Sequence, residues 1–390
     1  MKDALEGIRV LDLSQYFSGP WGSQLLADMG AEIIKVEMPG FGETLRLACM
    51  IRPEIEPLLT YLNRNKKSIT LDIKKPRARE IFKELVKNAE VDVVLENFTP
   101  DVMPRLGLGY EELKKINPKL IYAAITGFGQ TGPYKGKPAF DIIAQAASGI
   151  LDVYEIYTYP PRIPFSDLNA GAYVALGILE ALRFRDKTGK GQFVDISMHD
   201  MMFAYNLRAH VFSYIDKETL EKDRPTYNCF QAKDGSIALV VATERQFRNF
   251  CNAMGRPDLL KDRRFKNSKR RRDNSDLLFP IFREWIGSKT VKELLEILEK
   301  AHIPAGKIVP YEEAHKHPQI IARQMVVDKF DFPKAEGKPW FPNVFIRLSE
   351  SPGAFRTKAP ELGQHNKEVL SELLGYTAEE ISKLKKEGII

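Results

Sequence analysis

Asp167 is the residue whose type and position best suit catalysis. It lies in PFSDLNAG, where an extended, proline-containing approach meets a helix of small residues, so it should occupy or adjoin the helix N-cap. An acidic N-cap stabilises a helix by about 0.5–2 kcal/mol, and that structural role is sufficient by itself. A carboxylate at the positive end of a helix dipole would also stay ionised when partly desolvated, as a carboxylate nucleophile requires. The spacing alone does not separate the two roles.

Two glycine-rich stretches could bring the backbone close to a phosphate or a thioester: GFGQTGP, residues 127–133, and PGFGE, residues 39–43. Neither is a P-loop, because Lys137 is followed by Pro138 where that motif needs serine or threonine. Glycine also permits tight turns that bind nothing. Because loops after parallel strands often carry binding sites, both interpretations stay open.

No metal site can be identified from the sequence. The histidines form no HExxH motif, and the spacing of His315 and His317 is too common to indicate metal binding. The three cysteines, Cys49, Cys229 and Cys251, are far apart and form no CxxC, so neither a zinc site nor a disulfide framework is expected.

The densest basic run, residues 261–274, contains a single aromatic residue, Phe265. Nucleic-acid binding would favour interleaved aromatics or a recognition helix, so we interpret this run as a solvated surface. We therefore expect no nucleic-acid partner.

Strands and helices alternate over the first 200 residues. Short β-branched or apolar runs predict strands at residues 8–13, 32–37, 68–73, 91–95, 120–126 and 192–198. Helical patterns cover residues 19–29, 76–89 and the stretch that follows Asp167. This alternation predicts an α/β fold with a mostly parallel sheet covered on both faces. The turn SQYFSGP, residues 14–20, lacks GxGxxG, which disfavours an NAD-binding enzyme.

The helix after Asp167 is rich in alanine and glycine, so another backbone should pack close to it. Residues 216–226 are charged and are interpreted as a linker. A smaller unit follows, with a hairpin around the KDG turn in residues 230–241 and amphipathic helices such as residues 291–301. Residues 369–384 are expected to be helical again.

The composition is that of an ordinary globular protein, with 390 residues, 44% hydrophobic and 28% charged residues, and a net charge of +6. At roughly 150 residues per domain, two to three domains are expected. Scattered cysteines favour a reducing compartment, and MKDALEGIRV has no apolar signal segment. The longest apolar stretch, residues 163–182, is interrupted by Asp167 and Glu180, so no membrane span is expected. We predict a cytoplasmic protein.

The sequence resembles the class III CoA-transferases, a family that includes formyl-CoA transferase, crotonobetaine CoA-transferase and alpha-methylacyl-CoA racemase. The matching stretches occur in family order over nearly the whole chain. They are LEGIRVLDLS, SGP at Ser18, LADMGAEIIKVE, NRNKKSITLD, VLENFTPDVMPRLGLGYEEL, ITGFGQTGP, FDIIAQAASG, SDLNAGAYVALGILEALRFRDKTGKGQFVDISMHD, KDGSIAL, HPQ at His317 and LGQHNKEVL.

The resemblance implies a Rossmann-like large CoA-binding domain from residues 1–225 and 326–390, with a smaller α+β domain, residues 226–325, inserted between them. It also implies that two subunits form an interlocked homodimer. The implied activity is acyl-CoA:carboxylate CoA-transfer in acyl-CoA metabolism, with an acyl-CoA and a carboxylic acid as partners and coenzyme A thioester as substrate. No separate cofactor is implied.

In the family the catalytic aspartate corresponds to Asp167, which would form an aspartyl covalent intermediate. The implied coenzyme A contacts are Leu71, Asn97, Phe98, Arg105 and Leu106. Arg105 is the cation best suited to a phosphate. Backbone N–H groups near glycines would stabilise the oxyanions that develop in the reaction.

Several residues depart from the family pattern. The racemase branch has a proton-exchanging histidine at the position of Phe140, so the alternative of an acyl-CoA racemase or epimerase is disfavoured. Formyl-CoA transferase has glutamine at the position of Phe17, which makes formate and oxalate doubtful substrates. Arg46, Arg64 and Arg162 are candidates for binding the acceptor carboxylate.

Overall fold

The computed structural model describes residues 3–158, 161–215, 224–335 and 337–390. These residues form two compact units, 1–207 with 321–390 and 208–320, which are described separately below. The two domains expected from the resemblance, 1–225 with 326–390 and 226–325, remain a proposal about functional boundaries.

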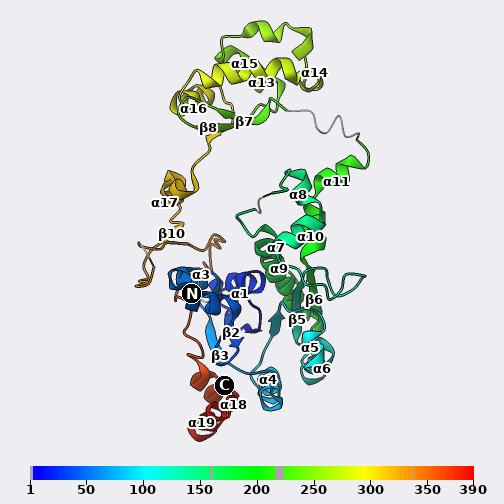
Figure 1. The fold of residues 1–390 in the computed structure, drawn as a ribbon, viewed down its shortest axis with the longest axis vertical. Helices are drawn as coiled ribbons and strands as arrows, with labels where there is room; N and C mark the ends of the chain where they lie inside the picture. Colours follow the sequence, from blue (N-terminus) through cyan, green and yellow to red (C-terminus); the bar gives the residue numbers. More distant parts are fainter. Residues whose placement is uncertain (1–2, 159–160, 216–223, 336) are drawn as a thin grey trace. The chain divides into compact units, whose positions relative to one another are not determined.

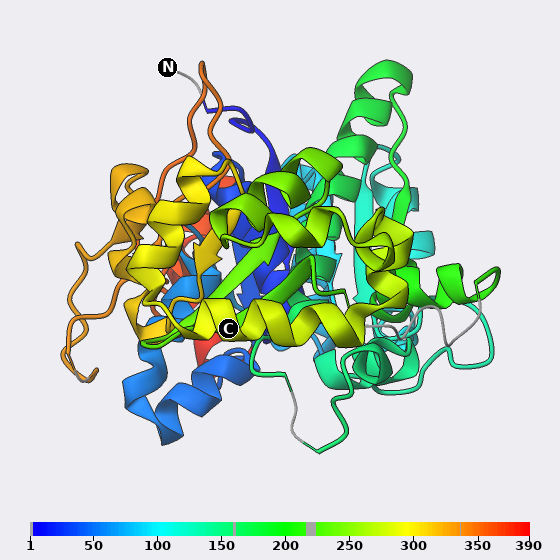
Figure 2. The ribbon, with the colours of Figure 1, turned by 90° about the horizontal axis from the view of Figure 1, so that it is seen from above.

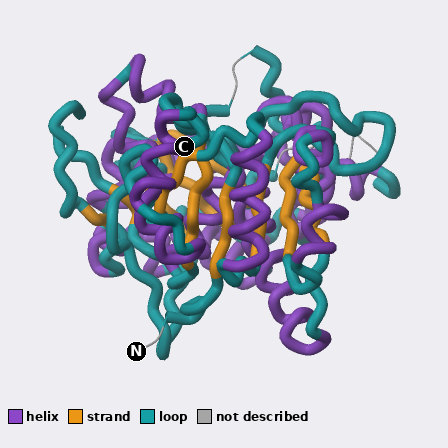
Figure 3. Tube along the Cα trace, turned by 90° about the horizontal axis from the view of Figure 1, so that it is seen from below, coloured by secondary structure: helices purple, strands orange, loops and turns teal. Residues whose placement is uncertain are grey.

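A six-stranded parallel sheet forms the centre of the larger unit (Figures 1 and 3). Its strands are β1 (Arg9–Asp12), β2 (Glu32–Glu37), β3 (Lys67–Thr70), β4 (Val93–Glu96), β5 (Ile121–Thr126) and β6 (Phe193–Ser197). The predicted α/β class and parallel sheet are confirmed. The order is β3-β2-β1-β4-β5-β6, so the direction of chain progression reverses between β1 and β4. Ligands of such sheets bind outside the carboxyl ends of the strands at this reversal.

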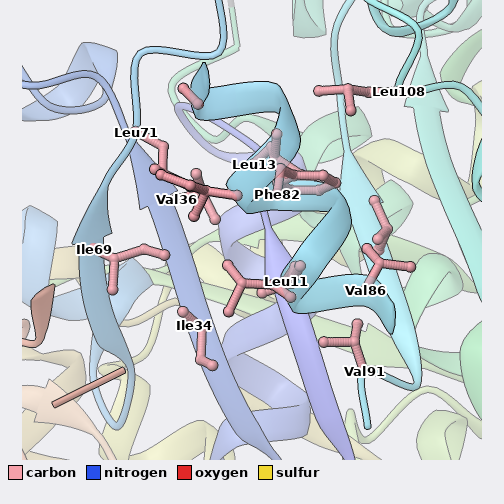
Figure 4. Close-up of a cluster of buried hydrophobic side chains, with 14 of the residues drawn as sticks. Leu11, Leu13, Ile34, Val36, Ile69, Leu71, Phe82, Val86, Val91 and Leu108 are labelled. Carbon is pink, nitrogen blue, oxygen red and sulfur yellow. The ribbon is translucent and has the colours of Figure 1, made fainter. Parts of the chain in front are cut away.

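Helices cover both faces of this sheet because the four inner strands, β1, β2, β4 and β5, carry apolar side chains on both sides. On one face the helices are α1 (Ser18–Asp28), α2 (Thr44–Ile51), α3 (Glu56–Asn63) and α9 (Phe165–Thr188). On the other they are α4 (Pro76–Asn88), α5 (Val102–Arg105), α6 (Tyr110–Ile116), α18 (Asn366–Leu374) and α19 (Ala378–Lys386). Figure 4 shows Leu11, Ile34 and Ile69 of the strands beside Phe82 and Val86 of α4.

Helix α9 packs closely against α1, as its small residues predicted. A Cβ atom added at Gly171 would lie 2.5 Å from the carbonyl oxygen of Ser18 and 3.0 Å from the backbone nitrogen of Gly22. Only glycine allows the two backbones to approach this closely. The contact fixes the start of α9 against the start of α1, and both helix starts line the cleft described below.

The C-terminal segment returns to the larger unit as two helices, where the sequence predicted one. Gly375 ends α18 in a left-handed conformation with φ of 74°, and Thr377 begins α19 with a capping box. Before α18, His365 and Ser68 exchange two hydrogen bonds, and Asn366 Oδ1 accepts one from the backbone N–H of Thr70. The segment therefore covers the free edge of β3.

The smaller unit contains an antiparallel sheet of β7 (Tyr227–Gln231), β8 (Ser236–Val240) and β9 (Ala305–Lys307). The pairing of β7 with β8 confirms the hairpin predicted around the KDG turn. Three helices share a core with this sheet: α13 (Glu244–Ala253), α15 (Ser275–Gly287) and α16 (Val291–Lys300) (Figure 2, green to yellow). A fourth helix, α14 (Ser268–Asp273), packs on α15. Most of the predicted linker, residues 216–226, lies outside the described residues.

The basic run at residues 261–274 is only partly the solvated surface that the sequence predicted. Arg271 is buried, pairs with Glu244 at 2.6 Å and lies over the ring of Phe247 at 4.2 Å. The prediction is wrong for this residue because the planar guanidinium can stack on an aromatic face while its edge binds a carboxylate.

The remaining elements are short. They are α7 (Asp141–Ala147), α8 (Ile150–Val153), α10 (Met198–Tyr205), α11 (Leu207–Phe212), α17 (Pro318–Ala322), β10 (Val326–Val327), β11 (Phe341–Pro342) and the 3-10 turns Pro53–Ile55, Pro257–Leu260, Arg263–Phe265 and Tyr311–Lys316. In the part of the chain that the structure describes, no helix is both long and apolar enough to cross a membrane.

Candidate active site

A cleft of about 720 Å³ opens at the carboxyl ends of β1, β4, β5 and β6, where the strand order reverses. The loops that follow these strands form its walls, together with the starts of α7 and α9. Its lining includes Gln15, Tyr16, Phe17, Ser18, Asn97, Phe98, Gly127, Gly129, Phe140, Asp141, Pro164 and Asp167. This is the position at which parallel α/β sheets hold their ligands.

Asp167 lies in the first turn of α9, three residues after the N-cap residue, which is Pro164. Its side chain is buried, and the residue is 8% exposed. Burial, and secondarily the neighbouring carboxylate of Asp141, raise the pKa of Asp167 to about 7. Burial therefore opposes ionisation of the Asp167 carboxyl, whereas the helix N-terminus is expected to favour it.

Asp141 is the first residue of α7 and faces the start of α9. Its Oδ1 accepts hydrogen bonds from the backbone N–H of Ser166 at 2.7 Å and of Asp167 at 3.2 Å. Among the described residues, no hydrogen bond reaches the side-chain oxygens of Asp167 itself. The site therefore places two carboxyl groups close together, and the described residues donate hydrogen bonds to only one of them, that of Asp141.

Asn97 and Phe98, which the resemblance implies as coenzyme A contacts, line the cleft with Asp167, and their contact with coenzyme A remains a prediction. The amide of Asn97 holds the loop after β1: its Oδ1 accepts from the N–H of Gln15 at 2.8 Å. Its Nδ2 donates to the Gln15 carbonyl at 2.8 Å and to Ser18 Oγ at 3.1 Å. Asn97 thus shapes the wall, while the Phe98 backbone N–H donates to Glu96 at 2.7 Å.

Leu71, Arg105 and Leu106 do not line the cleft. Leu71 is 2% exposed and belongs to the apolar core shown in Figure 4. Arg105 is exposed, and its Nε donates to the carbonyl of Asp101 at 3.0 Å. Leu106 packs against the same core as Leu71. Contacts of these three residues with coenzyme A remain predictions.

The loop after β1 brings aromatic side chains to the cleft. Tyr16 has a φ of 69°, which is a left-handed conformation unusual for a tyrosine, and its N–H donates to Glu43 at 3.0 Å. Its ring lies edge-on to Phe17 and to Phe140, with ring centroids 5.4 and 6.2 Å apart. Sequence reasoning missed Tyr16, because no local signal shows that a distant glutamate holds its backbone.

The two glycine-rich stretches differ in position. Gly127 and Gly129 line the cleft, but the N–H of Gly129 is already bonded to Thr126 Oγ1 and that of Gln130 to Asp195. The PGFGE stretch forms a turn, in which Gly40 and Gly42 have positive φ. Its glycines are not among the residues that line the cleft.

Two of the three arginines proposed for the acceptor carboxylate are already paired. Arg46 binds Glu37 at 2.6 Å, and the buried Arg64 binds Asp28 at 2.7 and 3.0 Å. Arg162 is exposed beside Pro161, which lines the cleft. Within the described ranges, no group of three or more His, Cys, Asp or Glu residues could hold a metal ion.

Comparison with known proteins places this site in a family. The model of CoA-transferase family III matches residues 5–366. The succinyl-CoA–D-citramalate CoA-transferase of Chloroflexus aurantiacus is 37% identical, over 99% of this chain and 98% of its own. The acetyl-CoA:oxalate CoA-transferase of Acetobacter aceti is 37% identical over 84% of this chain and 86% of its own. A crystal structure of a CAIB/BAIF family protein from Brucella suis superposes with a TM-score of 0.79 at 31% identity, covering 96% of this chain and all of its own. The chain therefore belongs to CoA-transferase family III and is a class III CoA-transferase.

Proposed function

We propose that this enzyme moves CoA from an acyl-CoA to a second carboxylic acid through a covalent intermediate on Asp167. One observation carries the proposal: the Asp167 carboxyl lines the cleft at the strand-order reversal, is almost fully buried, and receives no hydrogen bond from any described residue. A buried carboxylate without donors is poorly stabilised and is therefore a strong nucleophile.

The proposed reaction is a series of four acyl transfers between Asp167, the CoA thiolate and the two acids. Asp167 Oδ attacks the thioester carbon, the C–S bond breaks, and CoA leaves as thiolate, giving a mixed anhydride. The thiolate then attacks Cγ of Asp167, which releases the donor acid as carboxylate and leaves an aspartyl-CoA thioester. The acceptor carboxylate attacks that Cγ and expels the thiolate, which finally attacks the acceptor carbonyl and returns the Asp167 carboxylate.

The names of the relatives support a choice of substrates. The curated relatives include succinyl-CoA-dependent transferases for citramalate, malate and glutarate, all of which are dicarboxylic acids. We propose succinyl-CoA as donor and a dicarboxylic acid as acceptor. Oxalate is disfavoured by the Phe17 position, but it should be assayed as an acceptor beside the dicarboxylic acids above because one relative is named for it.

Trapping tests the covalent step. The enzyme is incubated with succinyl-CoA, quenched with hydroxylamine or borohydride, digested and analysed by mass spectrometry; a mass change is expected at Asp167. Asp167→Asn should show no change there and no turnover. Asp152→Asn, which removes a carboxyl from the neighbouring helix α8, is the matched control and should react like the wild type. Intact turnover with an unmodified Asp167 would contradict the mechanism.

The isomerase alternative makes a different prediction, namely solvent deuterium at the α-carbon of the acyl group. Phe140, which is 67% exposed beside the cleft, has no ionisable proton to exchange. We expect no deuterium incorporation in the absence of an acceptor acid.

We also retain two expectations: the interlocked homodimer, which the resemblance implies, and the cytoplasmic location, which the scattered cysteines and the N-terminal sequence favour. Apolar side chains of α9, including Leu176, Leu179 and Phe184, are exposed in the single chain, which supports an additional protein contact. Sedimentation equilibrium should give twice the monomer mass of 44.4 kDa.

A further inference from the structure

The N-terminus of α9 is capped by a residue from another helix. Its N-cap residue is Pro164, which has no side-chain oxygen to accept the free N–H groups of the first turn. Asp141 of α7 accepts two of them instead, those of Ser166 and Asp167, with Oδ1. The cap that a local serine or aspartate would supply therefore comes from α7.

Asp141 is itself held in place by two further hydrogen bonds. Its Oδ2 accepts from Gln145 Nε2 at 2.7 Å, one turn further along α7. Its backbone carbonyl accepts from Ser166 Oγ at 3.0 Å. Gln145 is 2% exposed and Ser166 is fully buried, so these bonds are shielded from water. The first turn of α9 is thereby fixed to the first turn of α7.

This arrangement removes the ordinary partners of the Asp167 side chain. An acidic residue at the third position of a helix usually reaches back to the N–H of the N-cap residue, as in a capping box. Pro164 has no N–H, and the nearby N–H groups of Ser166 and Asp167 already bind Asp141. The Asp167 carboxyl is therefore left without a donor at the helix end to which it belongs.

We propose that Asp141 is a positioning residue that, together with Pro164, keeps the Asp167 carboxyl detached from its own helix N-terminus and available in the cleft. The inference rests on the proposed covalent role of Asp167. It assigns Asp141 no contact with substrate and no proton transfer. Its action is to occupy the donors that would otherwise hold and weaken the nucleophile.

The charged surroundings make this assignment testable by pH. The described titratable groups on the other elements packed against α9 are Asp28 on α1, Tyr122 on β5, Asp195 on β6, Asp141 on α7, and His199, Asp200 and Tyr205 on α10. Of these, Asp141 is the one whose charge raises the pKa of Asp167, after the larger effect of burial. His199 and Asp200 lie 3.2 Å apart and interact with each other.

The test compares Asp141→Ala, Asp141→Asn and the control Asp152→Asn. The readouts are the single-turnover rate of Asp167 acylation by succinyl-CoA, its pH midpoint, and succinyl-CoA affinity by calorimetry with the non-reacting Asp167→Asn background. Alanine leaves the backbone N–H groups of Ser166 and Asp167 without their acceptor, so they become free to bind the Asp167 carboxyl. Acylation of Asp167 should then slow by ~10²-fold while the affinity for succinyl-CoA changes little, as expected for a misplaced nucleophile. Asparagine keeps an acceptor oxygen but removes the negative charge. Most of the acylation rate should therefore return, and the pH midpoint of acylation should fall because the Asp141 charge no longer raises the pKa of Asp167.

Wild-type rates and an unchanged midpoint in both Asp141 variants would overturn the inference while leaving the covalent mechanism intact. Conversely, turnover without any modification of Asp167 in the wild type would refute the proposed function, whatever Asp141 does. If the alanine variant does not fold, as judged by circular dichroism, the asparagine variant decides. A lowered midpoint supports the inference, and an unchanged one overturns it.

Discussion

Replacing Gly171 with alanine tests whether the contact between α1 and α9 positions the site. The new Cβ would lie 2.5 Å from the Ser18 carbonyl oxygen, 2.8 Å from Trp21 Cδ1 and 3.0 Å from the Gly22 nitrogen. Moving the helices apart by about 0.9 Å would restore the nearest of these contacts to 3.4 Å, the start of ordinary van der Waals distance. Two of the three atoms are backbone, so no side chain can simply rotate away.

Two opposing effects determine how much Gly171→Ala changes the free energy of unfolding. Alanine is favoured over glycine inside a helix by about 1 kcal/mol. Overpacking a close contact costs about 1–3 kcal/mol, and contact with rigid backbone places this site near the upper end. We expect the free energy of unfolding to fall by about 1–2 kcal/mol, measured by urea denaturation followed by circular dichroism. Because Ser18 and Asp167 both line the cleft, the single-turnover acylation rate should also fall, by ~10²-fold.

Gly177→Ala is the matched control in the same helix. Its new Cβ would meet the Cγ1 of Val194 at 2.8 Å, which is the end of a side chain that can adjust. This variant should lose less stability and retain wild-type acylation. The reasoning is refuted if Gly171→Ala is as stable and as active as the wild type, or if both variants lose activity equally.

Three further predictions concern buried carboxyl groups. Because the pKa of Asp167 is raised to about 7, acylation should speed up as pH rises through about 7 in rapid-quench assays; a pH-independent rate would contradict this. Burial alone would raise the pKa of Asp12, but Lys35 and Lys66 hold it well below its usual range. Asp12→Asn should therefore destabilise the fold by about 3–5 kcal/mol at pH 7 in urea titrations, with the difference shrinking below pH 4. Burial raises the pKa of Glu96 to about 8, so folding is penalised as pH rises from 4.5 to 8; relative to wild type, Glu96→Gln should gain stability over that range, and a constant difference would argue against a protonated Glu96.

Much of the sheet could be predicted because local pattern and tertiary environment agree. The run EIIKVE is apolar enough to be buried on both faces, and it forms β2 at the predicted residues 32–37. The small residues of α9 likewise predicted a close helix contact, which Gly171 makes with α1. The tail was predicted less well, since Gly375 ends one helix where apolar periodicity alone continued it.

The site was harder to predict because it depends on contacts between residues far apart in the sequence. Asp167 stood out through its position at a helix start, but its raised pKa comes from burial and from Asp141 on another helix. Pro164 is the local sign that the helix start needs a partner from elsewhere in the chain, because proline at the N-cap has no side-chain oxygen to accept the free N–H groups. Leu71 lies in the apolar core, and a sequence alone does not distinguish an apolar residue that enters the core from one that meets a ligand. Its contact with coenzyme A remains a prediction.

The return of the C-terminal segment to β3 has a consequence for biosynthesis. Ser68 and His365, which exchange hydrogen bonds, are 297 residues apart, so the ribosome finishes the edge strand long before its cover exists. In that interval β3 presents unpaired backbone groups, the kind of edge that recruits foreign strands. The nascent chain must therefore shield this edge by other means, such as chaperones, until residues 365–389 emerge. A truncation that removes residues 365–389 would keep every residue that lines the cleft but would expose the edge of the sheet to aggregation.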